Sequence, residues 1–401
     1  MNYRTLLKNV EKTLSAIENE DDVISTIVHV AEAVVQNFRR ELGILGGRLY
    51  VRQENSYVLE RGFGRSRRTS PGLTVPASYA PIRHAEQAGL VLADLSDPSV
   101  DLELEKRLGV NRFAAISIGE ERYLLSFDVH PKVAREDLLL SLGIIRTVVD
   151  NKVRKEKLEG LINEARRIQQ SILPKSIPVV GDYDVWGESV PAELVGGDFY
   201  DFLPLMEQGF GAAIADASGH GLLAALLVRD VYVGLRMGIG GEFKIARAIE
   251  RLNRIINQSR LTTKFVSLFY GEFEVGGEIV YVNAGHPSPL HLKRGVFHEL
   301  PSTGMVLGPS PNAVYGRRAV QMEPGDVMLL YTDGIVEAHD PHGRELGMGR
   351  VKRLVAENRR GPARLIGEKL LERVRAWNAG GAQEDDQTVV VIRRRAKGEA
   401  G

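Results

Sequence analysis

Four junctions in the second half of the chain each carry an aspartate where an apolar run meets a loop or a helix. Asp216 ends the run in GFGAAIAD, and Asp198 follows the two glycines of VGGD. Asp333 ends the run in GDVMLLYTD, and the adjacent Asp385 and Asp386 stand immediately before QTVVVIRR. Each aspartate taken singly could cap a helix or close a turn. Four such junctions in one region, most of them flanked by glycine, instead predict a shared site at the ends of strands.

Carboxylates gathered in one place predict a particular chemistry. Ionised carboxylates repel one another unless a cation lies between them. Oxygen ligands select hard cations such as Mg²⁺ or Mn²⁺ over zinc or copper. Two such ions, about 3.5–4 Å apart, can activate a water that attacks a phosphate ester. This chemistry needs no cysteine, and the chain contains none, which excludes disulfides, thiolate zinc sites and cysteine nucleophiles.

The composition is that of a globular protein without a strong charge bias. Hydrophobic residues make up 43% of the 401 residues, and 52 basic residues balance 52 acidic ones. A net charge of zero gives no general attraction to nucleic acid or to an anionic membrane. The N-terminal stretch MNYRTLLKNVEKTLS lacks the apolar core of a signal peptide, and no apolar run is long enough to span a bilayer. We therefore expect a cytoplasmic protein with neither nucleic acid nor membrane as a partner.

The first part of the chain, residues 1–140, predicts a small α+β domain. Apolar residues in DDVISTIVHVAEAVVQNF recur at helical spacing, and residues 1–41 are therefore predicted to be helical. The stretch GILGGRLYVRQENSYVLERGFG predicts two strands with a polar turn, and RFAAISIG and RYLLSFDV predict another pair. Mixed loops are expected between the two pairs.

A long helical pattern over residues 137–173 leads out of this domain, and we assign 141–173 as a linker. Its apolar positions Leu161, Ala165, Ile168 and Ile172 alternate at spacings of 3 and 4, as in the seam of a coiled coil. A single amphipathic helix lying on one domain would show the same pattern. The coiled-coil interpretation predicts a homodimer.

Residues 174–394 predict a second α+β domain, with antiparallel sheets and helices outside them. Helices are expected over 221–237, 243–258 and 362–377, between strand-like runs such as KFVSLFYGEFE and EIVYVNAGH, and QTVVVIRR supplies the last strand. Residues 395–401 are expected to be a flexible tail.

Six motifs follow one another through this second domain. In chain order they are VPAELVGGDFYDF, IADASGHGLLAALL, NAGHPSPL, STGMVLG, LLYTDGIVEA and EDDQTVVV, and ARRIQQSILPKSIP precedes them. This order resembles the bacterial stage-II-sporulation-E-like branch of the PPM (PP2C-type) serine/threonine phosphatases. The resemblance covers about residues 160–394 and implies a β-sandwich flanked by helices (α-β-β-α).

The resemblance also implies roles for the aspartates. Asp216 would bridge two Mn²⁺ or Mg²⁺ ions, with the carbonyl of Ala217 as a further ligand. Asp333 and Asp385 would complete the shell of ligands. Asp198 would act directly or through a metal-bound water.

Some roles stay open between alternatives. Asp386 is the alternative to Asp385, because only one of two adjacent side chains needs to face the metals. His220 is either a general acid for the leaving oxygen or part of a tight turn, and His286 in NAGHP is expected to be structural.

The implied substrate is phosphoserine or phosphothreonine on a signalling protein, in this branch often an anti-sigma-factor antagonist of the STAS type. A two-metal hydrolase of small phosphoesters and a non-catalytic scaffold are the alternatives. The N-terminal domain resembles, in its order of elements, a GAF domain that senses an unknown small molecule or protein. A PAS-like domain, or one that only dimerises, would show a similar order.

Overall fold

The computed structural model of the chain describes residues 23–38, 42–69, 71–205, 209–219, 221–238, 245–259 and 265–396. It divides into two compact units, Met1–Leu161 and Ile162–Gly401, each with hydrophobic cores of its own. Within these described ranges, no helix has both the length and the apolar character that crossing a bilayer requires.

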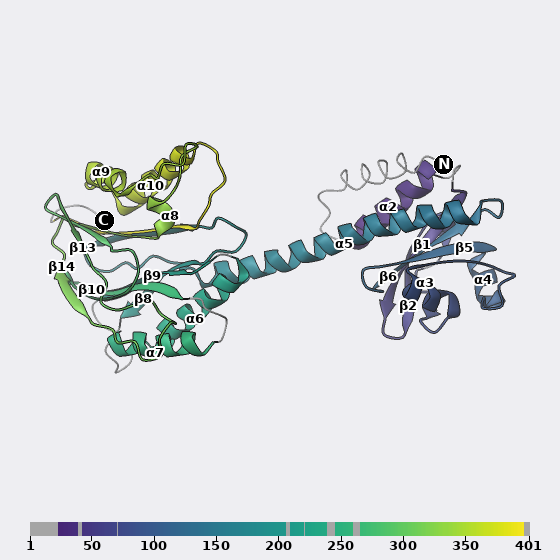
Figure 1. The fold of residues 1–401 in the computed structure, drawn as a ribbon, viewed down its shortest axis with the longest axis horizontal. Helices are drawn as coiled ribbons and strands as arrows, with labels where there is room; N and C mark the ends of the chain where they lie inside the picture. The colour runs from purple at the N-terminus through teal and green to yellow at the C-terminus, as the bar shows by residue number, and fades with distance from the viewer. Residues whose placement is uncertain are drawn as a thin grey trace. The chain divides into compact units, whose positions relative to one another are not determined.

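The first unit is built on one antiparallel sheet of six strands in the order β3-β2-β1-β6-β5-β4. Two helices cover one face of this sheet, and two shorter ones lie on the other face (Figure 1). The strands are β1 (Ile44–Gln53), β2 (Ser56–Gly64), β3 (Thr74–Pro76), β4 (Leu90–Asp94), β5 (Arg112–Ile118) and β6 (Tyr123–Val129). The helices are α2 (Val23–Phe38), η1 (Arg65–Arg68), α3 (Ala80–Ala88), α4 (Leu102–Leu108) and α5 (Arg135–Ile172).

The two strand pairs predicted from the sequence correspond to β1–β2 and β5–β6 of this sheet. The region expected to be mixed loops instead contains η1, β3, α3, β4 and α4. Each of these elements has nine residues or fewer, too short to show a clear period in the sequence. The predicted N-terminal helix is present as α2, and its first 22 residues lie outside the described part of the chain.

Helix α5 is buried along its first half and again at its last residue, Ile172. Leu138, Leu142, Ile145 and Val149, at spacings of 4, 3 and 4, are fully buried against the sheet together with α2. Further along the helix, apolar side chains become exposed, including Leu158 (60%), Leu161 (55%) and Ile168 (55%). One continuous helix therefore serves as a core element of the first unit, then as an exposed amphipathic segment, and contributes its last residue to a core of the second unit.

The second unit is a sandwich of two antiparallel five-stranded sheets, in the orders β14-β11-β10-β9-β8 and β13-β12-β15-β16-β7. The first sheet consists of β8 (Asp198–Leu205), β9 (Gly209–Ala217), β10 (Val266–Glu274), β11 (Glu278–Ala284) and β14 (Arg318–Gln321). The second consists of β7 (Tyr183–Val190), β12 (Leu290–Lys293), β13 (Val296–Glu299), β15 (Val327–Tyr331) and β16 (Gln387–Arg394).

Helices cover the outer face of each sheet, as Figure 1 shows. On β9, Ala213 and Ala215 face the helices, whereas Ala212 and Ile214 face the other sheet. Both faces of such a strand are buried, which is why its sequence is an unbroken apolar run. The α-β-β-α sandwich predicted from the sequence is confirmed. The helices are α6 (Leu222–Gly238), α7 (Ile245–Gln258), α8 (Asp333–Val336), α9 (Met348–Asn358) and α10 (Ala363–Asn378).

The packing of α10 on the second sheet depends on a glycine. A Cβ atom at Gly367 would lie 1.9 Å from Cζ3 of Trp186 on β7, a residue that is 7% exposed. We therefore expect Gly367→Ala to lower the free energy of unfolding of this unit. Overpacking lowers stability by about 1–3 kcal/mol, and so close an approach falls at the upper end of this range. Replacing glycine with alanine in a helix raises stability by roughly 1 kcal/mol, which is too little to offset that loss.

Urea unfolding followed by tryptophan fluorescence measures this effect, because both tryptophans of the chain, Trp186 and Trp377, lie in the second unit. The control is Gly349→Ala in α9, where an added Cβ would meet no atom within 4 Å. A Gly367→Ala protein as stable as this control would contradict the expectation.

Candidate active site

Strands β8 and β9 bring the first two aspartates together. Asp198 is the first residue of β8 and pairs directly with Asp216 near the end of β9. Directly opposed residues have Cβ atoms about 4.5–5.5 Å apart and point to the same face of the sheet. Asp201, three residues further along β8, therefore points to the other face, where it is 1% exposed and ion-paired with Arg236 at 2.8 Å. Strand geometry thus separates Asp201 from the site.

Strands β15 and β16 bring the other aspartates to one edge of the second sheet. Tyr331, at the end of β15, pairs with Val389 of β16. Asp333 follows the end of β15, and Asp385 and Asp386 precede the start of β16.

A glycine permits the close approach of these two segments. A Cβ at Gly334 would lie 2.1 Å from the carbonyl oxygen of Asp386 and 3.4 Å from Cβ of Asp385. The glycine of the TDG motif therefore lets the turn at Asp333 lie directly against Asp385.

The two sheets are joined at this edge through the carboxylate of Asp198. Its Oδ2 accepts hydrogen bonds from the hydroxyls of Thr332, at 2.8 Å, and Thr388, at 2.6 Å. Asp198 is 4% exposed. Because Thr332 follows β15 and Thr388 lies on β16, this one side chain connects the first sheet to the paired strands of the second.

Asp386 holds the loop that precedes β8. Its Oδ1 accepts a hydrogen bond from the amide of Ala192 at 2.7 Å, and its Oδ2 accepts from the amides of Gly197 and Asp198. A Cβ at Gly196 would lie 2.7 Å from this Oδ2 atom, so the first glycine of VGGD provides room for the carboxylate. Both oxygens of Asp386 are therefore used by the backbone, which favours the neighbouring, exposed Asp385 as the residue that faces an ion.

The carboxylates influence one another electrostatically. Burial raises the pKa of Asp216 to about 7, and the negative charges of Asp333, Asp385 and Asp386 contribute to the increase. Burial, followed by the charges of Asp216 and Asp386, also raises the pKa of Asp198 well above its usual range, although the two threonine hydroxyls act to lower it. A cation placed here would relieve this repulsion.

The donor set suits a hard divalent cation because every donor is an oxygen atom. The absence of a side chain on Gly197 leaves space in front of the backbone, since a Cβ there would lie 3.0 Å from the carbonyl oxygen of Ala217 and 3.2 Å from that of Gly219. Among the residues that the structure describes, no three His, Asp or Glu side chains are arranged ready to hold an ion. The carboxylates are neighbours in space and would have to close around a metal.

A buried histidine lies behind Asp216. Ser267 is the cross-strand neighbour of Asp216 on β10, and its hydroxyl is 2.8 Å from Nδ1 of His286. Burial lowers the pKa of His286 to about 3, so its ring is neutral. These contacts agree with the expected structural role of His286, whereas His220 lies outside the described residues.

Sequence reasoning missed one contact that joins α5 to this site. The side-chain oxygen of Gln169 accepts a hydrogen bond from the amide of Gly196 at 3.0 Å, and its side-chain amide donates to the carbonyl of the same residue. Gln169 lies in the lead-in motif ARRIQQSIL, which was the available signal. Thr332 and Thr388 were also missed, although each lies within three residues of an aspartate that the motifs marked.

This fold is that of a PP2C-type phosphatase. The solved SiaA-PP2C domain of Pseudomonas aeruginosa superposes with a TM-score of 0.54 at 20% sequence identity, covering 60% of this chain and 98% of that domain. Residues 207–395 match the sequence model of the family described as "Stage II sporulation protein E (SpoIIE)". The second unit therefore contains a SpoIIE-type PP2C phosphatase domain.

Two curated relatives align over most of this chain. The "Phosphoserine phosphatase RsbU" of Bacillus subtilis (strain 168) is 26% identical over 244 residues, which cover 60% of this chain and 72% of RsbU. "Protein IcfG" of Synechocystis sp. is 25% identical over 279 residues, which cover 62% of this chain. The chain spans 44% of the length of IcfG.

We expect the two adjacent aspartates to differ sharply on substitution. Asp386→Asn places an amide donor against backbone amides, and leaving a buried donor unsatisfied costs about 1–3 kcal/mol of unfolding free energy. Asp385→Asn removes a charge that repels Asp216 and should leave stability unchanged or slightly higher. Urea unfolding in the absence of divalent ions, followed by tryptophan fluorescence, compares the two. Equal losses of stability would contradict the assignment of Asp386 as the structural member of the pair.

Proposed function

We propose that the second unit is a metal-dependent phosphatase that hydrolyses phosphoserine or phosphothreonine on a signalling protein. The observation that carries this proposal is the group of carboxylates around Asp216, whose pKa is raised to about 7 by burial and by neighbouring negative charges. Such a group is suited to divalent cations rather than to a side-chain nucleophile. The relatives RsbU and RsbP of Bacillus subtilis, each named a phosphoserine phosphatase, support the reaction class.

In this proposal Asp216, Asp333 and Asp385, with the carbonyl of Ala217, would hold two Mn²⁺ or Mg²⁺ ions. When bound, the ions supply a water that is nucleophilic near neutral pH and hold the phosphate oxygens. Asp198 acts directly or through a metal-bound water. Its hydrogen bonds to two threonines orient it, and such fixed supporting contacts keep site residues in the geometry that the reaction needs.

Substitution of Asp216 is the direct test. With Mn²⁺, the purified chain is expected to release phosphate from a phosphoserine STAS-domain protein. Asp216→Asn is expected to reduce kcat/KM by orders of magnitude, because it removes a carboxylate that would hold the ions. A chelator should abolish the activity of the wild type.

The control variant is Asp201→Asn, which changes a carboxylate on the neighbouring strand β8 that points to the opposite face of the sheet. Activity that survives both chelation and the Asp216→Asn change would contradict the proposed mechanism. Activity confined to small phosphoesters would instead favour the alternative of a small-molecule hydrolase.

The substrate that we propose is an anti-sigma-factor antagonist of the STAS type, and with it a cytoplasmic location. This part of the proposal rests on the order of the six motifs that resemble the sporulation-phosphatase branch. We further propose that the first unit, as a GAF-like sensor, regulates the phosphatase through α5. The contact between Gln169 of α5 and Gly196, beside the loop that positions Asp198, supports this role.

We also propose that the chain is a homodimer, with α5 of one protomer paired to α5 of its partner. The exposed Leu158, Leu161 and Ile168 lie 3 and 7 residues apart, which places them on one coiled-coil seam. Leaving a row of apolar side chains in water is unfavourable, and pairing with a second copy would bury it.

The double substitution Leu161→Lys and Ile168→Lys should convert a dimer into a monomer in sedimentation velocity and change the phosphatase activity. The matched control is Val179→Lys with Val314→Lys, which changes two exposed apolar residues outside the helix, at 92% and 76% exposure. This control should remain dimeric. A wild type that sediments as a monomer would remove the dimer from the proposal.

A further inference from the structure

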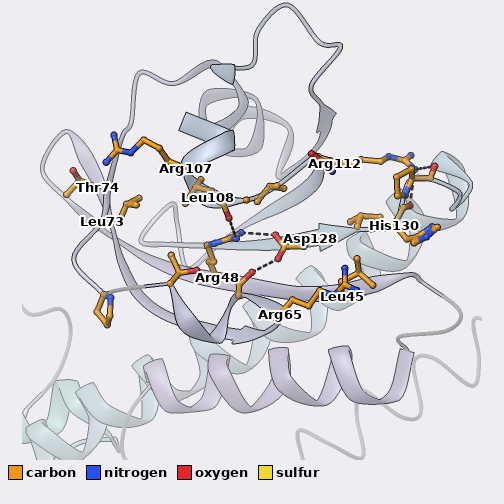
Figure 2. Close-up of a pocket in the computed structure, with 18 of the residues that line it drawn as sticks. Leu45, Arg48, Arg65, Leu73, Thr74, Arg107, Leu108, Arg112, Asp128 and His130 are labelled. Atoms are coloured by element: carbon orange, nitrogen blue, oxygen red, sulfur yellow. Dashed lines mark hydrogen bonds and ion pairs between the residues drawn. The ribbon is translucent and has the colours of Figure 1, made fainter. Parts of the chain in front are cut away.

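The first unit contains an open hollow of about 1320 Å³, beside β1, β6 and the end of α4. Its charged lining is strongly one-sided, with the four arginines Arg48, Arg65, Arg107 and Arg112 against the single carboxylate of Asp128. Figure 2 shows Arg48 in the middle of the hollow, between Arg107 on one side and Arg112 on the other. This local excess of positive charge contrasts with the net charge of zero for the whole chain.

Arg48 is a buried arginine at the centre of this hollow. It is 2% exposed, and its Nη1 atom lies 2.7 Å from Oδ1 of Asp128 while Nη2 donates to the carbonyl of Leu108 at 2.7 Å. Its Nε is buried without a hydrogen-bond partner. The other carboxylate oxygen of Asp128 accepts a hydrogen bond from the hydroxyl of Ser66. The only carboxylate among the lining residues is therefore fully occupied, while Arg48 retains an unused donor.

The remaining arginines are held differently. Arg112 donates to the backbone carbonyls of Pro131 and Val133, at 2.8 and 3.0 Å, and has Asp94 as its cross-strand neighbour. Arg65 and Arg107 are exposed, and neither forms an ion pair with any residue in the described ranges. Two guanidinium groups at the hollow thus lack a counter-charge.

We propose that this hollow binds a small molecule that carries two or more phosphate groups. The planar guanidinium of arginine matches the geometry of phosphate oxygens and binds them through paired hydrogen bonds. The hollow is larger than the roughly 300–1,000 Å³ of typical small-molecule pockets, so it has room for more than a single phosphate group. Its concave shape favours a small molecule over a flat protein surface. This inference does not depend on the phosphatase activity, because it concerns the first unit alone.

Calorimetric titration of the full chain with inorganic pyrophosphate and tripolyphosphate tests the proposal. A chelator is included so that the carboxylate group of the second unit, without divalent ions, repels the probes. We expect saturable binding at low ionic strength that weakens as salt screens the arginines. Inorganic phosphate should bind more weakly than tripolyphosphate, because it reaches fewer of them.

The variant Arg65→Gln with Arg107→Gln is expected to weaken tripolyphosphate binding at least about tenfold, the ratio that corresponds to 1.4 kcal/mol. It leaves the buried Arg48–Asp128 pair intact. The matched control, Arg61→Gln with Arg83→Gln, removes the same charge from exposed positions that do not line the hollow and should bind like the wild type. Absence of binding by the wild type, or equal weakening in both double variants, would overturn the proposal.

Discussion

The arrangement of the two sheets in the second unit depends on the buried carboxylate of Asp198, which accepts hydrogen bonds from two threonine hydroxyls. Asp198 begins a strand of one sheet, and the threonines that donate to it, Thr332 directly after β15 and Thr388 on β16, belong to the other sheet's edge of the site. A buried carboxylate without donors would cost several kcal/mol, so these contacts fix how the sheets meet. They also place Asp216, its cross-strand partner, beside Asp333 and Asp385. The interaction that joins the sheets is therefore the one that gathers the acidic side chains.

Much of this arrangement could be predicted because the relevant residues interrupt strong local patterns. An aspartate at the end of an apolar strand is conspicuous, and strand pairing then determines which aspartates meet. Strands β7 and β8 were harder to find, because charged and polar residues in DYDVWGESV and a proline in DFYDFLPL weaken their apolar pattern. Which of Asp385 and Asp386 faces an ion could not be predicted from the sequence. The answer depends on backbone amides almost two hundred positions away, and a local motif contains no information about them.

The hollow of the first unit could not be predicted from the sequence at all. Its arginines come from β1, η1, α4 and β5, and no two of them share a sequence motif. Only the six-stranded sheet and the helices around it bring them together. The chain therefore holds two oppositely charged regions, an acidic one in the second unit and a basic one in the first, although its overall charge is zero. The net charge of the whole chain therefore gives no sign of either region.

The paired hydrogen bonds between Gln169 and Gly196 fix the rotation of α5 about its own axis at the end of the helix. An α-helix has 3.6 residues per turn, so one inserted or deleted residue upstream would turn every preceding side chain by about 100° relative to this anchor. A change of seven residues, close to two full turns, nearly restores the original orientation. A change of seven residues therefore keeps the faces of the helix in register with this anchor, whereas a change of one does not.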